Sequence, residues 1–263
     1  MSEPKTALVY ERYELKYHIP LALVAEISDY IADFCELDHY SLKSPDQYYT
    51  INNLYLDTPN YLFFNTRLAG MDNRFNMRVR TYGTGEPEMW FLEVKHKSKG
   101  FVTKTRAKLL DRTWLKHLVE GTLPERDEAV VRKDYAYDFA KKVMSYQAAP
   151  VVFTQYRRKA FFSTIDDYAR VTFDKELRYV PRREYRFTPS PDMQFYDHPE
   201  LFDPYTNVVL ELKCEAAVPW WMLDLIRRFN LQRASFSKFM YALNESMQDH
   251  PDIVTHPNRI SAW

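Results

Sequence analysis

Arg78 and Arg80 share one side of a predicted strand, which makes them the first candidates for a chemical role in this sequence. Successive side chains of a strand point to opposite faces, so the apolar residues between the two arginines lie on the other side. Two guanidinium groups on one face are difficult to satisfy with surface ion pairs alone. They match the geometry of phosphate, which arginine binds bidentately. The pattern therefore predicts a phosphate-binding strand.

Other segments carry the same alternation with carboxylates added. Glu93 and Lys95 share the polar side of one predicted strand, and Glu211 and Lys213 share that of another. Carboxylates at such positions can hold a divalent metal that bridges phosphate oxygens. The pattern is found again in Glu14-Leu15-Lys16 and in Arg170-Val171-Thr172-Phe173-Asp174.

For a single strand, a polar face exposed to water is the commoner explanation of this alternation. Five such strands together favour a sheet that curls, with its ionic face inward and its apolar face under helices. A charged lumen between walls of low dielectric constant would bind a polyanion more strongly than an open surface would. We therefore expect an internal anion site.

The elements that must position these residues follow from hydrophobic periodicity. Alternation of period two predicts strands at 7–19, 48–56, 73–83, 89–97, 100–109, 151–163, 169–179 and 207–214. Helical signals predict helices at 20–34, 58–68, 113–120, 125–147, 219–229 and 235–247, and five prolines make 181–206 irregular. We predict an α+β fold in one domain over residues 1–263: a closed antiparallel eight-stranded β-barrel tunnel with helices packed outside.

The composition limits the classes of function. Lysines plus arginines and aspartates plus glutamates both total 36 in 263 residues, so no overall basic field marks a nucleic-acid or membrane-surface binder. Cys35 and Cys214 lie far apart and outside any metal-binding spacing, which fits a reducing cytoplasmic compartment. No apolar run resembles a signal peptide or reaches the roughly 18 to 20 residues of a membrane span.

Nine ordered motifs are together more specific than any one of them. With them the sequence resembles the triphosphate tunnel metalloenzymes, and within that group the polyphosphate-polymerase domain of the vacuolar transporter chaperone (VTC) family. The resemblance spans nearly the whole chain. The motifs are Glu14-Leu15-Lys16, Tyr55-Leu56-Asp57-Thr58, Arg67 with Arg78-Val79-Arg80, Leu92-Glu93-Val94-Lys95, Lys104-Thr105-Arg106, Tyr156-Arg157-Arg158-Lys159-Ala160-Phe161, Arg170-Val171-Thr172-Phe173-Asp174, Leu210-Glu211-Leu212-Lys213 and Ser237-Lys238.

The resemblance implies an enzyme that transfers the γ-phosphoryl group of ATP to a growing polyphosphate chain, with Mg²⁺ or Mn²⁺ as cofactor. It implies that Glu211 binds the metal, and Glu14 is either a second metal ligand or the ion-pair partner of a lumen arginine. The residues expected in catalysis are Arg78, Arg80, Lys95, Arg158 and Arg170. Those expected to bind phosphate are Lys16, Arg67, Lys104, Ser237 and Lys238, with Arg106 and Lys213 as additional basic lining.

Two details refine this assignment. Arg158 is preferred to Arg157 because it shares strand parity with Ala160. The hydrolytic and cyclase branches of the fold carry an N-terminal E-x-E-x-K motif, whereas this sequence has Arg12 at the first glutamate position, and Glu11 is out of register. This departure favours the VTC-like branch over a two-metal hydrolase.

Three functions remain open at this point: polyphosphate polymerase, tripolyphosphatase or nucleoside triphosphatase on the same fold, and non-catalytic polyphosphate or RNA-end sensor. A polymerase needs no dedicated general base, because the attacking chain end is already an anion, whereas a hydrolase must activate water. The expected partners are ATP and inorganic polyphosphate, without nucleic acid and without a membrane segment in this chain. No P-loop motif is present, and the tunnel would take over its role of cradling phosphates.

Overall fold

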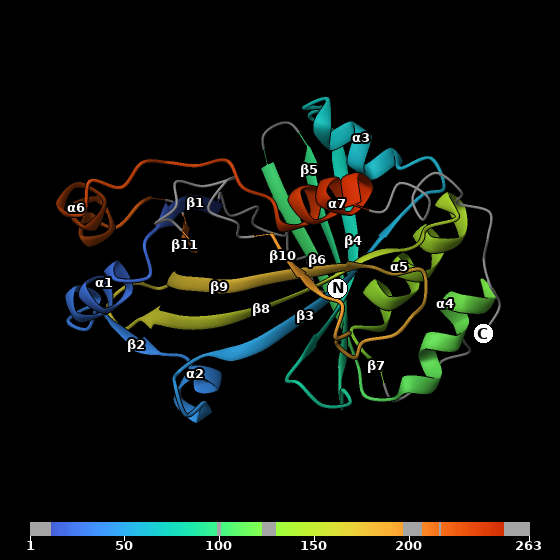
Figure 1. The fold of residues 1–263 in the computed structure, drawn as a ribbon, viewed down its shortest axis with the longest axis horizontal. Coiled ribbons are helices and arrows are strands. Elements are labelled where there is room, and N and C mark those ends of the chain that lie inside the picture. Colours follow the sequence, from blue (N-terminus) through green and yellow to red (C-terminus); the bar gives the residue numbers. More distant parts are fainter. Residues whose placement is uncertain (1–11, 99–100, 123–129, 197–206, 216, 250–263) are drawn as a thin grey trace, which may run out of the picture.

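A single antiparallel sheet organises the computed structural model, which describes residues 12–98, 101–122, 130–196, 207–215 and 217–249. Its main path runs β1-β11-β9-β8-β3-β4-β5-β6-β7, with β10 paired to β9 and β2 paired to β8 (Figure 1). The strands are β1 (Arg12–Ile19), β2 (Cys35–Leu37), β3 (Tyr49–Asp57), β4 (Arg74–Tyr82), β5 (Trp90–Ser98), β6 (Phe101–Leu109), β7 (Val130–Val131), β8 (Ala149–Ser163), β9 (Ala169–Pro181), β10 (Gln194–Phe195) and β11 (Val208–Glu215).

The eight long strands are those expected from period-two alternation, with small shifts at their ends. Residues 7–11 of the first predicted strand lie outside the described residues. The short strands β2, β7 and β10 were not predicted, because two or three residues cannot display a period. The strand β10 lies within the stretch that the prolines marked as irregular.

The predicted closed eight-stranded barrel is wrong. Among the described residues, β1 pairs within the sheet only with β11, and β6 pairs only with β5 and β7, so no ladder joins the two ends. The sheet nevertheless curls strongly. Glu14 Oε2 on β1 and Lys95 Nζ on β5 are 2.7 Å apart, although five strands separate β1 from β5 in the sheet order. The result is a half-barrel with an open side.

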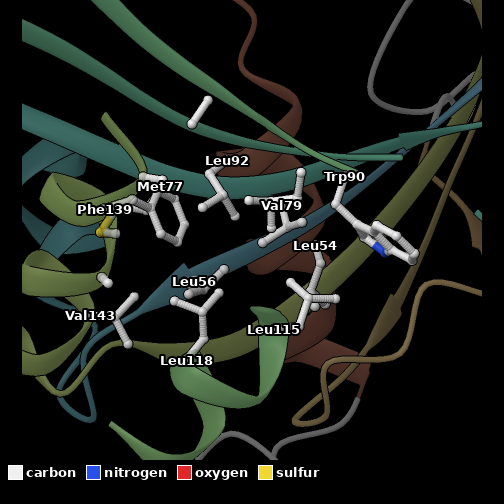
Figure 2. Packing of buried hydrophobic residues seen from close by; sticks show 14 of the residues in the cluster. Leu54, Leu56, Met77, Val79, Trp90, Leu92, Leu115, Leu118, Phe139 and Val143 are labelled. Atoms are coloured by element: carbon white, nitrogen blue, oxygen red, sulfur yellow. The ribbon is translucent and has the colours of Figure 1, made fainter. Parts of the chain in front are cut away.

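One half of the convex face is apolar and buried under helices. Leu54, Leu56, Met77, Val79 and Leu92 point to this side, away from the arginines of the same strands. The helices α4 (Lys116–Glu120) and α5 (Lys133–Tyr146), with the short 3-10 helix η1 (Arg112–Leu115), cover them (Figure 2). Burial of these side chains on one face fixes which face remains for the ionic residues.

Two further helices cover the other half of the convex face. Trp221, Met222 and Leu225 of α6 (Trp220–Arg228) and Ile27 of α1 (Leu23–Ile31) are buried against β1, β9 and β11. The two helices lie together at one end of the molecule in Figure 1, opposite α4 and α5. Helices thus cover two parts of the convex face, one toward each end of the molecule.

The last helix has a different place, because α7 (Lys238–Asp249) packs on the concave side. Its Phe239, Ala242 and Leu243 are buried against Tyr55 and Tyr156, whose side chains point inward from β3 and β8. The ring centroids of Phe239 and Tyr55 are 5.0 Å apart. An apolar plug therefore fills part of the interior.

The remaining helices correct several predicted limits. The helix expected over 125–147 is α5, which begins only at Lys133; residues 123–129 lie outside the described part of the chain. The helix expected from 235 begins at Lys238. The short helix α2 (His39–Lys43) was not predicted, and the predicted patch at 58–68 contains α3 (Leu62–Leu68). Asp57 accepts backbone hydrogen bonds from Thr58, Phe63 and Phe64, which gives it an architectural role at the start of α3.

Candidate functional site

A cavity of about 310 Å³ lies on the concave face, and every residue predicted from the sequence as part of the site lines it. The lining contains eleven lysines and arginines but only two carboxylates, together with six tyrosines, among the described residues. The fourteen predicted residues are Glu14, Lys16, Arg67, Arg78, Arg80, Lys95, Lys104, Arg106, Arg158, Arg170, Glu211, Lys213, Ser237 and Lys238. Their roles as ligands remain predictions.

Glu93 organises one wall of the cavity. Its carboxylate is 2% exposed and lies 2.7 Å from Arg78, 2.6 Å from Lys104 and 3.2 Å from Arg106, with Arg80 at 3.9 Å. The strand register creates this cluster, because Glu93 is paired with Arg78 on β4 and with Arg106 on β6. One negative charge thus holds four cations, and a strong net positive charge remains.

Arg80 has the least compensated charge in this wall. Its Nε donates to Asn53 Oδ1 at 2.9 Å and its Nη2 donates to Tyr156 Oη at 3.3 Å, both neutral acceptors. Its side chain is 8% exposed. A guanidinium group held by neutral partners in a buried wall is well placed to bind an anion.

Asp174 and Glu211 organise the opposite wall. Asp174 receives two hydrogen bonds from Arg158, at 2.6 and 2.7 Å, and an ion pair from Lys238 at 2.7 Å. Glu211 lies 2.8 Å from Lys213, with Lys16, Lys238 and Arg158 between 3.4 and 3.8 Å away. Lys238 begins α7, so the plug helix contributes its first side chain to this wall. This wall is a shared network of cations and carboxylates.

Glu14 joins the two walls across the interior. Besides Lys95 it contacts Lys213, whose Nζ lies 3.7 Å from a Glu14 oxygen and 2.8 Å from Glu211. Both carboxylates therefore approach one point in the cavity. Their oxygens are the hard ligands that Mg²⁺ and Mn²⁺ prefer, and Mg²⁺ in phosphate sites takes only one or two carboxylates. The donor set fits such a metal, although the described residues contain no group of three or more acidic, histidine or cysteine side chains that could hold one without phosphate.

Arginine and tyrosine side chains lie together at the rim of the cavity, where β3 begins and β4 ends. Arg170 Nη2 donates to Asp38 Oδ2 at 3.1 Å and to Tyr49 Oη at 3.3 Å. Arg106 Nη2 donates to Tyr82 Oη at 2.9 Å. These hydroxyl groups fix the direction of two predicted phosphate ligands.

The electrostatics keep the buried carboxylates ionised. Burial alone would raise the pKa of Glu211, but the surrounding Lys213, Lys16 and Lys238 hold it well below its usual value. The same opposition acts on Glu93, where the neighbouring arginines and lysine outweigh burial and keep the pKa low. For Glu14, burial is likewise outweighed, mainly by Lys213 and Lys95, and its pKa falls to about 2. These groups are weak bases.

These pKa shifts predict acid lability. Because the folded-state pKa values of Glu93 and Glu211 lie below the reference value of 4.5, both carboxylates favour the folded state above that pH. The contribution is lost as the pH falls from 4.5 through the folded-state values. Burial raises the pKa of Asp57 to about 6. This carboxyl group therefore lowers the stability of the fold as the pH rises from 3.8 to about 6, and its effect on stability is constant below pH 3.8. Urea unfolding from pH 3.8 to pH 2, below the range in which Asp57 acts in the opposite direction, should give a steadily falling free energy of unfolding; a flat profile there would contradict this network.

Sequence reasoning missed the structural role of several acidic residues. It treated Glu93 only as one of several carboxylates able to hold a metal, gave Asp38 no function, and included Asp174 only as part of a motif. The available signal was their place on the polar side of strands that also carry arginine or lysine, as in Glu93-Val94-Lys95. The preference for Arg158 agrees with the structure, since Arg158 lines the cavity whereas Arg157 pairs with Asp46 outside it. The side chain of Arg12, and Glu11 altogether, lie outside the described residues.

The structure is a curled antiparallel sheet around a cationic cavity, and comparison of the sequence gives the family. The model of the VTC domain matches residues 11–246, so this chain belongs to the VTC domain family. The resemblance found in the motifs is thereby confirmed.

Two relatives carry the name vacuolar transporter chaperone complex subunit 4. They come from Trypanosoma cruzi and Trypanosoma brucei brucei, and each is 25% identical over 232 residues, which is 78% of this chain. The chain spans 28% of the length of either relative. None of the helices among the described residues is long and apolar enough to cross a membrane.

Solved structures resemble the chain only distantly. A putative adenylate cyclase from Bacillus halodurans gives a TM-score of 0.47 at 10% identity, covering 88% of this chain and 96% of that one. A putative adenylate cyclase from Vibrio parahaemolyticus gives 0.45 at 11% identity, covering 88% and 97%.

Proposed function

We propose that this chain synthesises inorganic polyphosphate by transferring the γ-phosphoryl group of ATP to the end of a growing chain. The observation that carries the proposal is the cavity lined by eleven lysines and arginines and only two carboxylates among the described residues. Membership of the VTC domain family and the two relatives named above support it. A linear polyanion offers one negative group for each successive cation along such a wall.

In the proposed step, a terminal oxygen of polyphosphate attacks the γ-phosphorus of ATP. The bond from that phosphorus to the β–γ bridging oxygen breaks, and its electron pair leaves with ADP, so the chain grows by one phosphate. Arg78 and Arg80 from one wall and Arg158 from the other would hold the transferring group in line. Phosphoryl transfer depends on such positioning and charge stabilisation more than on covalent help from the protein.

The low pKa values of the cavity carboxylates favour transfer to phosphate over transfer to water. A hydrolase must remove a proton from water, usually with a carboxylate or a metal. Glu14, with a pKa of about 2, and Glu211, held well below its usual value, are poor proton acceptors near neutral pH. The end of a polyphosphate chain is already anionic and needs no base.

The proposed cofactor is Mg²⁺ or Mn²⁺, with Glu211 as its ligand and Glu14 as a second one. A divalent ion would neutralise charge on the phosphates of ATP and orient the γ-group. Without the metal, these carboxylates remain paired with Lys213 and Lys95. Isothermal titration with Mn²⁺ in the presence of tripolyphosphate should detect metal binding that Glu211→Gln weakens.

The decisive experiment incubates the pure protein with ATP and Mn²⁺ or Mg²⁺, with and without a short polyphosphate primer. ADP, free phosphate and long chains are then resolved. Long chains formed in step with ADP are the expected result. Free phosphate without chain growth would instead identify a tripolyphosphatase or nucleoside triphosphatase, and tight metal-independent binding without turnover would identify a sensor; either result would overturn the proposal.

A further inference from the structure

A second basic space adjoins the cavity along the open side of the half-barrel. This groove, of about 620 Å³, is lined by residues 13–16 of β1, residues 74–76 of β4 and residues 233–236 before α7, with Lys95 and Lys97 of β5. It borders the same side chains as the cavity at several points, among them the Glu14–Lys95 ion pair. The groove therefore begins where the cavity ends.

Four of the six cations that line the groove differ from Lys16 and Lys95, which it shares with the cavity, in having no acidic partner among the described residues. Arg67, Arg74, Lys97 and Arg233 all line the groove, and none of them forms an ion pair with an acidic side chain among the described residues. The deeper cations, in contrast, share Glu93, Asp174 and Glu211. A row of unpaired positive charges is repulsive on its own and is relieved by a bound polyanion.

The neighbouring part of this end of the sheet, beside the groove, is filled by α7. Phe239, Ala242 and Leu243 fill the concave face at that end, in contact with Tyr55 and Tyr156. Phosphate groups lose hydration without compensation against such apolar walls. A chain that leaves the cavity at this end therefore cannot pass over the plug without displacing it, whereas the adjoining groove offers positive charge.

We propose that the groove is a second binding site for polyphosphate, in which Arg74, Lys97 and Arg233 hold the already synthesised part of the chain as it leaves sideways through the open side of the sheet. This inference rests on the proposed function and adds the path of the product. None of these three residues belongs to the set predicted from the sequence. The groove thus extends the site from the reacting end of the chain to segments beyond it.

The test compares binding of a short and a long ligand. In the variant Arg74→Gln/Lys97→Gln/Arg233→Gln, we expect the affinity for polyphosphate of about 100 units to fall about tenfold, since each exposed charge contact contributes little alone. Affinity for tripolyphosphate, which fits within the cavity, should stay unchanged. A matched variant, Lys43→Gln/Lys141→Gln/Arg227→Gln, removes three exposed cations that line neither space and should bind both ligands as the wild type does.

Because Arg74 also donates a hydrogen bond to the backbone oxygen of Met71, the double variant Lys97→Gln/Arg233→Gln serves as a second test that leaves it in place. In the primed assay, both groove variants should start at the wild-type rate but yield shorter chains. If the wild type binds both ligands and the triple variant keeps the wild-type affinity for long chains, the groove proposal is overturned and the proposed function is not. A wild type that binds neither ligand would overturn the proposed function and the groove with it.

Discussion

Arg80→Ala is expected to lower the rate of polyphosphate synthesis about 10²- to 10³-fold while leaving the protein folded. The guanidinium group of Arg80 is held by Asn53 and Tyr156, which are neutral, so its charge is available to the transferring phosphate. Removal of the Arg80 guanidinium group leaves no carboxylate without a cation, because Glu93 keeps its ion pairs with Arg78 and Lys104. The rate is measured from ADP formation with primer, and folding from a urea unfolding curve.

Arg157→Ala is the matched control. Arg157 belongs to the same sheet but lies outside the cavity, where it pairs with Asp46 at 2.7 Å. Its loss should leave the rate close to that of the wild type. Arg80→Lys should recover only part of the activity, since an ammonium group keeps the charge but not the bidentate geometry. Wild-type rates for Arg80→Ala would remove it from the proposed catalytic set.

Glu93→Gln is expected to destabilise the fold by roughly 3–5 kcal/mol, the usual cost of removing one partner from a buried ionic cluster. The substitution keeps the shape of the side chain but leaves Arg78, Arg80, Lys104 and Arg106 without their shared carboxylate. These cations then repel one another within a buried wall. Urea unfolding at neutral pH measures the loss.

Tripolyphosphate should partly rescue Glu93→Gln, because a bound anion can replace the missing negative charge. The gain in unfolding free energy on adding it should therefore exceed that of the wild type. Glu86→Gln is the control, since the Glu86 side chain is 71% exposed and, among the described residues, pairs only with Arg112, at 3.8 Å. It should change stability by less than about 0.5 kcal/mol. A comparably small effect in Glu93→Gln would show that Glu93 does not organise the cluster.

The face of the sheet on which each strand side chain lies could be predicted, because it depends only on local alternation along the strand. Arg78 and Arg80 had to share a face, and the apolar residues between them had to lie under helices; Met77 and Val79 are indeed fully buried there. The same reasoning separated Arg158 from its neighbour Arg157. Such parity needs no knowledge of which strands are paired.

Closure of the sheet could not be predicted in the same way. It would require a ladder between β1 and β6, which are distant in sequence and whose facing edges carry no local signature. The alternation of each strand is equally compatible with a closed barrel and with the half-barrel described here. The place of α7 is similarly a matter of tertiary packing, since Phe239, Ala242 and Leu243 would suit either face of the sheet.

The distinct roles of the two similar motifs in β5 and β11 also depended on their neighbours. Glu93-Val94-Lys95 and Glu211-Leu212-Lys213 look alike in sequence. Both carboxylates have four cations around them, but Glu93 lies between the arginines and lysine of β4 and β6, whereas Glu211 has Lys213, Lys16, Lys238 and Arg158 around it and approaches Glu14. Only the strand order distinguishes these two surroundings, and metal binding by Glu211 stays a prediction.

The buried carboxylates also determine how ionic strength acts on the protein. Cations on an open surface gather small ions from solution, and a polyanion that displaces them binds less tightly as salt is added. In the cavity, Glu93, Asp174 and Glu211 already serve as built-in counterions, so fewer solution ions are there to be released. Binding of a short phosphate chain inside should therefore depend less steeply on salt than retention of a long chain, which also uses the groove cations without acidic partners among the described residues.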